Sequence, residues 1–188
     1  MSLLQTRDLV KKYSGRAVVD RVGLHVAPGE IVGLLGRNGA GKTTTFRMIV
    51  GMIAPNDGVV VFDGADVTGM PMFKRARRGM GYLSQEPSVF QRLSVRDNLM
   101  AILETMNYSG RQRRQRADDL LENFGLVHVA GHQARTLSGG ERRKLEIARA
   151  LITNPMMLLL DEPFSGVDPI AVEDLQGEIR RLKEQGIS

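Results

Sequence analysis

The segment at residues 36–43 reads GRNGAGKT, and it constrains this chain more than any other feature. It follows the pattern G-x-x-x-x-G-K-[ST], with an apolar run before it and a helical pattern over 41–50 after it. Glycines let the backbone curl until several N–H groups converge on one anion, and the following helix adds its positive end. Lys42 supplies a cation for phosphate, and the Thr43 hydroxyl can ligate Mg²⁺. The candidate phosphate-binding residues are Gly36, Arg37, Asn38, Gly39, Ala40, Gly41, Lys42, Thr43 and Thr44.

The apolar run at 30–35 predicts a buried parallel strand, so the strand, loop and helix together indicate an α/β fold. Further short strands are expected at 59–62, 81–83 and 156–160. Asp168 followed by proline predicts the start of another helix. The alternative for the loop itself is a glycine-rich turn that only joins a strand to a helix.

A second constellation lies at 158–162, where LLLDE places two carboxylates directly after an apolar strand. The carboxyl end of a parallel strand is the edge at which such folds bind ligands. Asp161 is therefore the candidate metal ligand, held directly or through water. Glu162 is the candidate general base that polarises an attacking water. The alternative is a pair of turn or capping carboxylates.

A second glycine-rich helix start lies at 137–141, which reads LSGGE. Ser138 and Glu141 have the spacing of a capping box, and Gly139 and Gly140 leave the first backbone N–H groups uncovered. The segment therefore predicts a second anion-binding helix start, about a hundred residues after the first.

Composition narrows the class of protein. The 188 residues include no cysteine, which excludes disulfide scaffolds, thiolate zinc sites and thiol catalysis. Hydrophobic residues make up 42% of the chain, so it is predicted to fold into a globular domain. No apolar run approaches the roughly 18 residues that span a bilayer, and the first residues do not read as a signal peptide. We expect a soluble, cytoplasmic protein.

The middle of the chain differs from its ends. Residues 94–124 have a helical pattern, with apolar residues spaced along two helix faces. The segment 70–118 holds ten Lys or Arg and four Asp or Glu, and we interpret its two basic runs as solvated helix faces. The alternative is contact with nucleic acid, and the absence of aromatic residues interleaved with the runs argues against it.

The phosphate loop, LSGGE and the strand ending in Asp-Glu, in this order, resemble the motifs of ATP-binding subunits of ABC transporters. The resemblance runs from about residue 3 to residue 188. It implies a P-loop NTPase core, 1–85 and 136–188, with a mostly parallel sheet and an antiparallel N-terminal β portion. A helical subdomain, 86–135, would be inserted into this core. The implied cofactors are ATP and Mg²⁺, and the implied activity is ATP hydrolysis.

Further roles come from the resemblance alone. Two subunits would pack head to tail, and Ser138, Gly139, Gly140 and Glu141 of one would cover ATP on the other. Tyr13 would stack on adenine, Gln85 would contact Mg²⁺ or the lytic water, and Asp168 would communicate across the dimer. Tyr13 as a plain surface aromatic and Gln85 as a strand-end polar residue are the alternatives. Transmembrane subunits would dock near Val89, Phe90 and Leu93, although Phe90 could instead pack the subdomain onto the core.

The sequence also resembles the lipopolysaccharide-export ATPases of Gram-negative bacteria, in the segments 43–51, 76–83, 92–100 and 161–169. That resemblance implies a cytoplasmic protein, peripheral on the cytoplasmic face of the inner membrane. Branched-chain amino-acid importer ATPases share parts of these segments and stay an alternative. A soluble ABC ATPase acting on nucleic acid and a non-catalytic nucleotide-binding fragment are two others.

The chain departs from the family pattern at three places. Gly166 and Val167 stand where many relatives have alanine and leucine. Arg37 stands where the family usually has proline, which the backbone-based binding should tolerate. The switch histidine would fall beyond Ser188, because none of His25, His128 and His132 lies at its position. We therefore expect a C-terminally truncated chain with little or no ATPase activity of its own.

Overall fold

The computed structural model describes residues 2–188, and these form two compact units. Of these residues, unit 1 comprises 2–82, 155–161 and 182–188, and unit 2 comprises 83–154 and 162–181. The boundaries differ from the predicted domain limits, because residues around the LSGGE helix group with the helical middle of the chain. The predicted limits of a helical subdomain at 86–135 stay a prediction.

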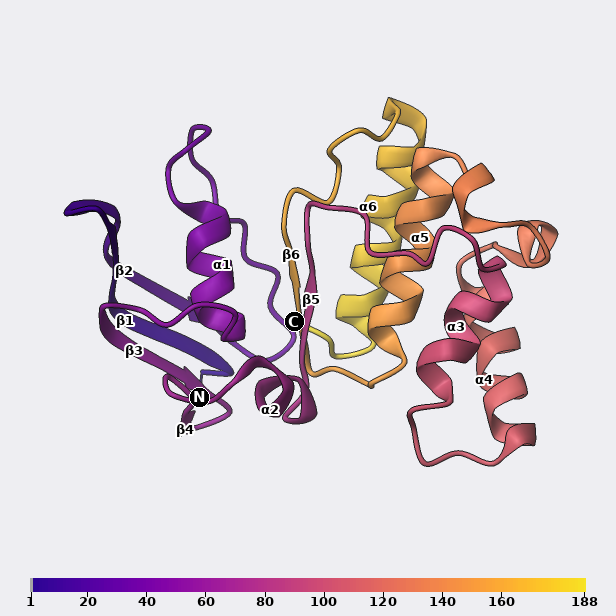
Figure 1. Cartoon of the computed structure of the whole chain (residues 1–188), viewed down its shortest axis with the longest axis horizontal. Coiled ribbons are helices and arrows are strands. Elements are labelled where there is room, and N and C mark those ends of the chain that lie inside the picture. The colour runs from indigo at the N-terminus through magenta and orange to yellow at the C-terminus, as the bar shows by residue number, and fades with distance from the viewer. Residues whose placement is uncertain (1) are drawn as a thin grey trace. The chain divides into compact units, whose positions relative to one another are not determined.

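Unit 1 is built on a four-stranded antiparallel sheet in the order β2-β1-β3-β4. The strands are β1 (Leu4–Tyr13), β2 (Arg16–Val26), β3 (Asp57–Phe62) and β4 (Ala65–Asp66). Ser14 and Gly15 both have positive φ, as a two-residue hairpin turn requires, and they join β1 to β2. Helix α1 (Lys42–Val50) packs on β1 and β2 (Figure 1). The predicted antiparallel N-terminal portion is thus confirmed.

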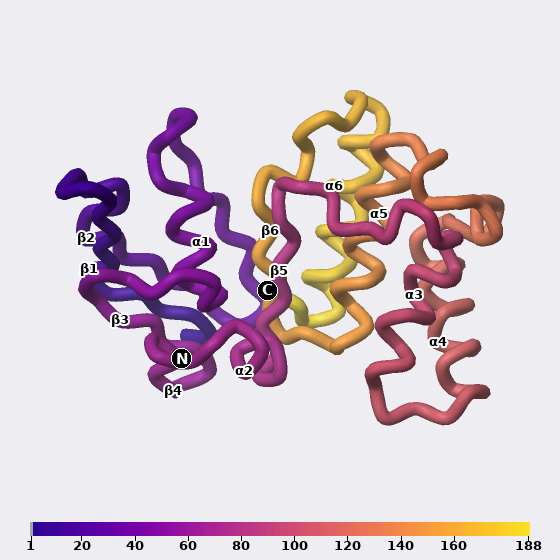
Figure 2. The backbone as a smooth tube through the Cα atoms, in the orientation of Figure 1, coloured from indigo at the N-terminus to yellow at the C-terminus, as the bar shows by residue number. Residues whose placement is uncertain are grey.

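A second sheet in the chain pairs β5 (Met80–Leu83) with β6 (Met157–Leu160) in parallel. The predicted strands at 81–83 and 156–160 are confirmed within one residue. The C-terminal end of the chain lies beside β6 (Figure 2), where the Leu158 N–H donates to the Ser188 carbonyl at 2.8 Å. On its other side, the Ser188 hydroxyl accepts from the Gly29 N–H at 2.8 Å.

The prediction of a buried strand at 30–35 is wrong for this structure. The segment has no strand assignment, and Ile31, Val32 and Leu35 are exposed, Leu35 to 92%. A strand needs a neighbour that completes its hydrogen-bond ladder. Within residues 2–188 no strand pairs with this segment, so its apolar side chains stay uncovered. The local sequence pattern carries no information on whether such a neighbour is present.

Unit 2 is helical. It contains α3 (Val95–Leu103), α4 (Gly110–Asn123), α5 (Gly139–Leu151) and most of α6 (Pro169–Glu184), which lie side by side in pairs (Figure 1). Short 3₁₀ turns follow α4 at Val127–Val129 and Ala134–Thr136, and α2 (Met72–Arg77) belongs to unit 1. The predicted helical middle is confirmed as two helices that pack on each other through buried Val95, Leu99, Leu103, Ala117, Leu120, Leu121 and Phe124.

Both of these helices begin with a serine cap. The Ser94 hydroxyl accepts from the Asp97 N–H, and Ser109 forms a full capping box with Gln112. Such caps satisfy backbone N–H groups that a helix leaves without partners, and they fix where the helix starts. Among residues 2–188, no helix is both long and apolar enough to cross a membrane.

Candidate functional site

The phosphate loop of unit 1 leads directly into α1, which begins at Lys42. Gly41, the residue before Lys42, has a φ of +87°, and its backbone lies so close to β2 that a Cβ would meet the Val18 carbonyl oxygen at 2.5 Å. Only glycine fits this combination of conformation and space. The first N–H groups of a helix have no intrahelical acceptor. Since no side chain caps α1, these groups are left for an anion.

Lys42 is folded back onto the loop that precedes it. Its ammonium group donates to the carbonyls of Gly36 at 2.8 Å and Arg37 at 3.1 Å. A lysine held this way keeps its charge beside the loop backbone, where a bound phosphate would sit. The substitution of arginine at position 37 is compatible with this geometry, since Arg37 contributes its backbone carbonyl. The Ala40 N–H also donates to that carbonyl and closes the turn.

The first carboxylate of the Asp-Glu pair lies in the same unit as the loop. The Thr43 hydroxyl donates to Asp161 Oδ1 at 3.1 Å, although the two residues are 118 positions apart in the chain. Asp161 is buried, with 2% of its surface exposed, at the end of β6. The structure therefore brings together two of the three predicted metal ligands.

The residues at this point fit a magnesium ion. In the part of the chain that the structure describes, no three His, Cys, Asp or Glu side chains cluster as a metal-binding group. Mg²⁺ does not need one, because it commonly takes one or two protein oxygens and fills the other positions with phosphate and water. A threonine hydroxyl beside a buried carboxylate is such a partial oxygen set.

Tyr82 also reaches Asp161, and the sequence analysis did not identify it. Its hydroxyl, on β5, donates to Asp161 Oδ2 at 3.3 Å. Burial and the neighbouring Asp161 carboxylate raise the pKa of the Tyr82 phenol. No motif marked this residue; the only available signal was a polar aromatic in a short strand that otherwise reads as apolar.

Tyr13 lies at the end of β1 with 50% of its surface exposed. Its ring faces the Lys11 ammonium at 5.5 Å from the ring centroid. The ring is therefore accessible for stacking, as its predicted role on adenine requires. That role stays a prediction.

In unit 2, Gln85 and Glu162 contact each other directly. The Gln85 amide donates to Glu162 Oε2 at 2.8 Å, across 77 positions of sequence. Glu162 has a φ of +47°, a conformation that non-glycine residues rarely adopt. Such backbone strain is kept only where surrounding contacts impose it, and it is typical of functional sites.

An arginine that the sequence did not single out holds the residues next to both partners of this pair. Arg143, on α5, donates to the Ser84 carbonyl at 3.0 Å and to the Pro163 carbonyl at 3.1 Å. It also pairs with Glu146 at 2.8 Å, and both side chains are buried. One helix thus fixes the residue before Gln85 and the residue after Glu162. An i,i+3 pair of opposite charges is common on exposed helix faces, so the sequence did not distinguish it.

The LSGGE segment forms the start of α5, as predicted. Ser138 and Glu141 make the capping box, and the Ser138 backbone N–H, which donates to Glu141, lowers the pKa of that carboxyl. A Cβ on Gly139 would meet the Gly166 carbonyl oxygen at 2.9 Å, and one on Gly140 would meet the Ala171 Cβ at 2.7 Å. Both glycines are therefore required by close packing within unit 2.

Asp168 lies before α6, where its carboxylate accepts from the Ala171 N–H at 3.0 Å. It therefore acts as the predicted helix cap. Of the three predicted docking residues, Phe90 and Leu93 are exposed whereas Val89 is buried. The Phe90 ring packs against the Arg149 guanidinium, 4.6 Å from the ring centroid.

Comparison with known proteins identifies a family. Residues 19–165 match the family described as ABC transporter. The chain is 52% identical to the lipopolysaccharide export system ATP-binding protein LptB of Haemophilus influenzae, over all of this chain and 78% of that protein. The identity and the coverage are the same for LptB of Escherichia coli. A solved ATP-binding cassette of an ABC transporter superposes with a TM-score of 0.91 at 29% identity, covering all of this chain and 79% of that one.

Proposed function

The chain belongs to the ABC transporter family, and we propose that it is the ATP-binding and ATP-hydrolysing subunit of a transporter that exports lipopolysaccharide. The observation that carries this proposal is the 52% identity of the entire chain with lipopolysaccharide export system ATP-binding proteins. In the structure, Thr43 of the phosphate loop is hydrogen-bonded to Asp161.

ATP would lie on the phosphate loop. The open N–H groups of α1 and the Lys42 ammonium would bind its phosphates, and the exposed Tyr13 ring would stack on the adenine. Thr43 and Asp161 would hold Mg²⁺, with Gln85 as a further ligand. When bound, Mg²⁺ supplies charge that offsets the negative charge developing on the phosphate oxygens.

Glu162 would act as the general base. It follows Asp161 directly in the chain, and the Gln85 amide holds one of its oxygens at 2.8 Å, which leaves the other free to accept a proton from water. The carboxylate is half-buried, so a water molecule can reach it. Gln85 would orient the same water through its remaining hydrogen-bonding capacity.

The chain would work as a head-to-tail dimer. The exposed Ser138 and the start of α5 would close over the phosphates held by the other subunit, since this helix start offers backbone N–H groups that its capping box does not use. Asp168 would take part in contacts across the dimer, in addition to its cap on α6. ATP binding would close the dimer and hydrolysis would open it.

Transmembrane subunits would dock on unit 2 near Phe90 and Leu93, which are both exposed. A helix from such a subunit, with an apolar face, is a suitable partner for an exposed aromatic ring. The protein would then be cytoplasmic and peripheral on the inner membrane. Val89 would support this surface from beneath, because it is buried.

Calorimetric titration with ATP tests the proposed nucleotide site. Lys42→Ala should weaken ATP binding at least tenfold, about 1.4 kcal/mol, because the phosphates lose their main cation. Lys183→Ala, an exposed lysine on α6, is the matched control and should bind like the parent. Equal affinity of Lys42→Ala and the parent would overturn the assignment of the loop.

Co-purification tests the transport role. The tagged protein, expressed with its neighbours in the native host, should retain integral membrane subunits, and its depletion should stop lipopolysaccharide from reaching the cell surface. Retention of membrane subunits with normal surface lipopolysaccharide would leave the ATPase assignment intact and reject the substrate.

A further inference from the structure

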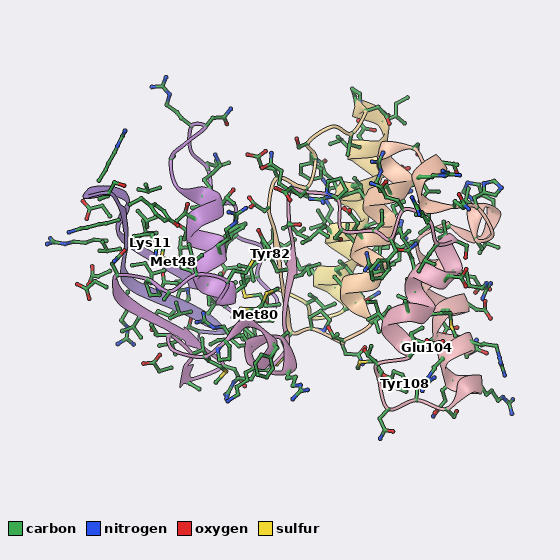
Figure 3. All side chains as sticks on the ribbon, viewed as in Figure 1. Lys11, Met48, Met80, Tyr82, Glu104 and Tyr108 are labelled. Carbon is green, nitrogen blue, oxygen red and sulfur yellow. The ribbon has the colours of Figure 1, made fainter. Side chains whose placement is uncertain are left out.

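The carboxylate of Asp161 is held from two sides by hydroxyl groups of different elements. Thr43, in α1, donates to Oδ1, and Tyr82, on β5, donates to Oδ2. The first contact comes from the phosphate loop and its helix, whereas the second comes from a strand that carries no other predicted site residue. Figure 3 shows Tyr82 on this strand, together with Met80 two residues earlier.

Strand β5 is well placed to hold a side chain rigidly. Met80 and Leu83, on either side of Tyr82, are buried. At Gly81, β5 approaches β6 so closely that a Cβ would meet the Leu158 side chain at 2.8 Å. Since Asp161 follows β6 directly, the close packing of the two strands fixes the separation of Tyr82 and Asp161.

The contact suits a tyrosine that donates rather than one that ionises. A carboxylate with 2% exposure loses most of its hydration, so it depends on hydrogen bonds from the protein. A tyrosine phenol is protonated at neutral pH, so the Tyr82 hydroxyl acts as the donor in this contact. A phenylalanine ring would fill the same space without that donor.

We propose that Tyr82 is a positioning residue of the metal site, whose hydroxyl holds Asp161 Oδ2 so that the carboxylate keeps one orientation toward Mg²⁺ and nucleotide. The inference rests on the proposed function, because it gives Asp161 its role as metal ligand. Removing a group that hydrogen-bonds to a metal ligand, without contacting the metal itself, typically lowers metal affinity about 10- to 100-fold.

The test is the ratio of two affinities measured on one protein: the Kd for ATP in EDTA divided by the Kd for ATP in saturating Mg²⁺. Tyr82→Phe should lower this ratio at least tenfold and leave the Kd in EDTA close to that of the parent. Tyr108→Phe, a tyrosine between α3 and α4, is the matched control and should keep the parent ratio (Figure 3). Asp161→Asn provides the reference for a lost metal ligand.

A merely structural role would give a different result. If Tyr82 only supported the fold, Tyr82→Phe would weaken both affinities together, with a lower melting temperature and an unchanged ratio, and that outcome overturns the proposal. An unchanged ratio with Tyr82→Phe, while Asp161→Asn abolishes the Mg²⁺ effect, overturns it and leaves the proposed function intact. A parent protein whose ATP affinity ignores Mg²⁺ would overturn both the inference and the metal site.

Discussion

The Gln85 amide nitrogen lies 2.8 Å from Glu162 Oε2, and this contact joins the two predicted catalytic residues within unit 2. The two residues come from different segments of the chain, since Gln85 follows β5 and Glu162 follows β6. The contact occurs where Glu162 has a positive φ, so the backbone is strained at the point where the carboxylate is presented. Gln85 and Glu162 are therefore expected to act as a pair.

Glu162→Gln should separate binding from chemistry. The amide keeps the shape of the side chain and an oxygen that accepts from Gln85, but it cannot accept the proton from water. We expect ATP to bind as in the parent while phosphate release falls by about two to four orders of magnitude. Single-turnover assays of the assembled transporter measure this, and turnover at the parental rate would contradict the role of Glu162 as base.

Arg143→Met should destabilise the protein strongly. The substitution removes the hydrogen bonds to the Ser84 and Pro163 carbonyls and takes the paired cation away from the buried Glu146 carboxylate. Loss of one partner of a buried pair typically costs about 3–5 kcal/mol. Denaturant unfolding measures the change.

Lys144→Met is the matched control for that experiment. Lys144 is the residue after Arg143 on α5. Its substitution breaks the ion pair with Asp174, whose side chain is 62% exposed. Exposed pairs contribute about 0–1 kcal/mol. Equal losses for the two variants would show that Arg143 is no more than a surface charge.

Phe90→Ala should distinguish docking from core packing. The ring is 45% exposed, so its removal cannot cost the roughly 3–5 kcal/mol expected of a core phenylalanine. We expect a loss of about 1 kcal/mol or less, mainly from the contact with Arg149. Binding to the membrane subunits should weaken clearly, as co-purification would show. A large drop in melting temperature with binding intact would favour a packing role.

Gly140→Ala should disrupt the start of α5 because the added methyl group meets the Ala171 Cβ at 2.7 Å. Overpacking of this kind typically costs about 1–3 kcal/mol. Gly177→Ala, in α6, is the control, because nothing lies within 4 Å of its added Cβ. That change should stabilise the protein by about 0.5–1 kcal/mol. Thermal unfolding of both variants checks the opposite signs.

Much of the chemistry could be predicted from the sequence because it depends on short local patterns. The phosphate loop needs glycines at set positions and a lysine and threonine at the following helix start. The capping boxes at Ser138 and the helix cap at Asp168 are likewise contacts between residues three positions apart. Residue type and spacing suffice for such features, because the backbone geometry of a helix start is nearly constant.

Contacts between distant segments were decided only by the tertiary structure. Tyr82 contacts Asp161 across 79 positions of sequence, and Arg143 contacts Ser84 across 59. No short-range spacing of residues predicts either contact. The segment 30–35 shows the same limit in the opposite direction. Its apolar run specifies a strand only if another strand lies beside it, and hydrogen bonds to a neighbour depend on the whole fold rather than on local sequence.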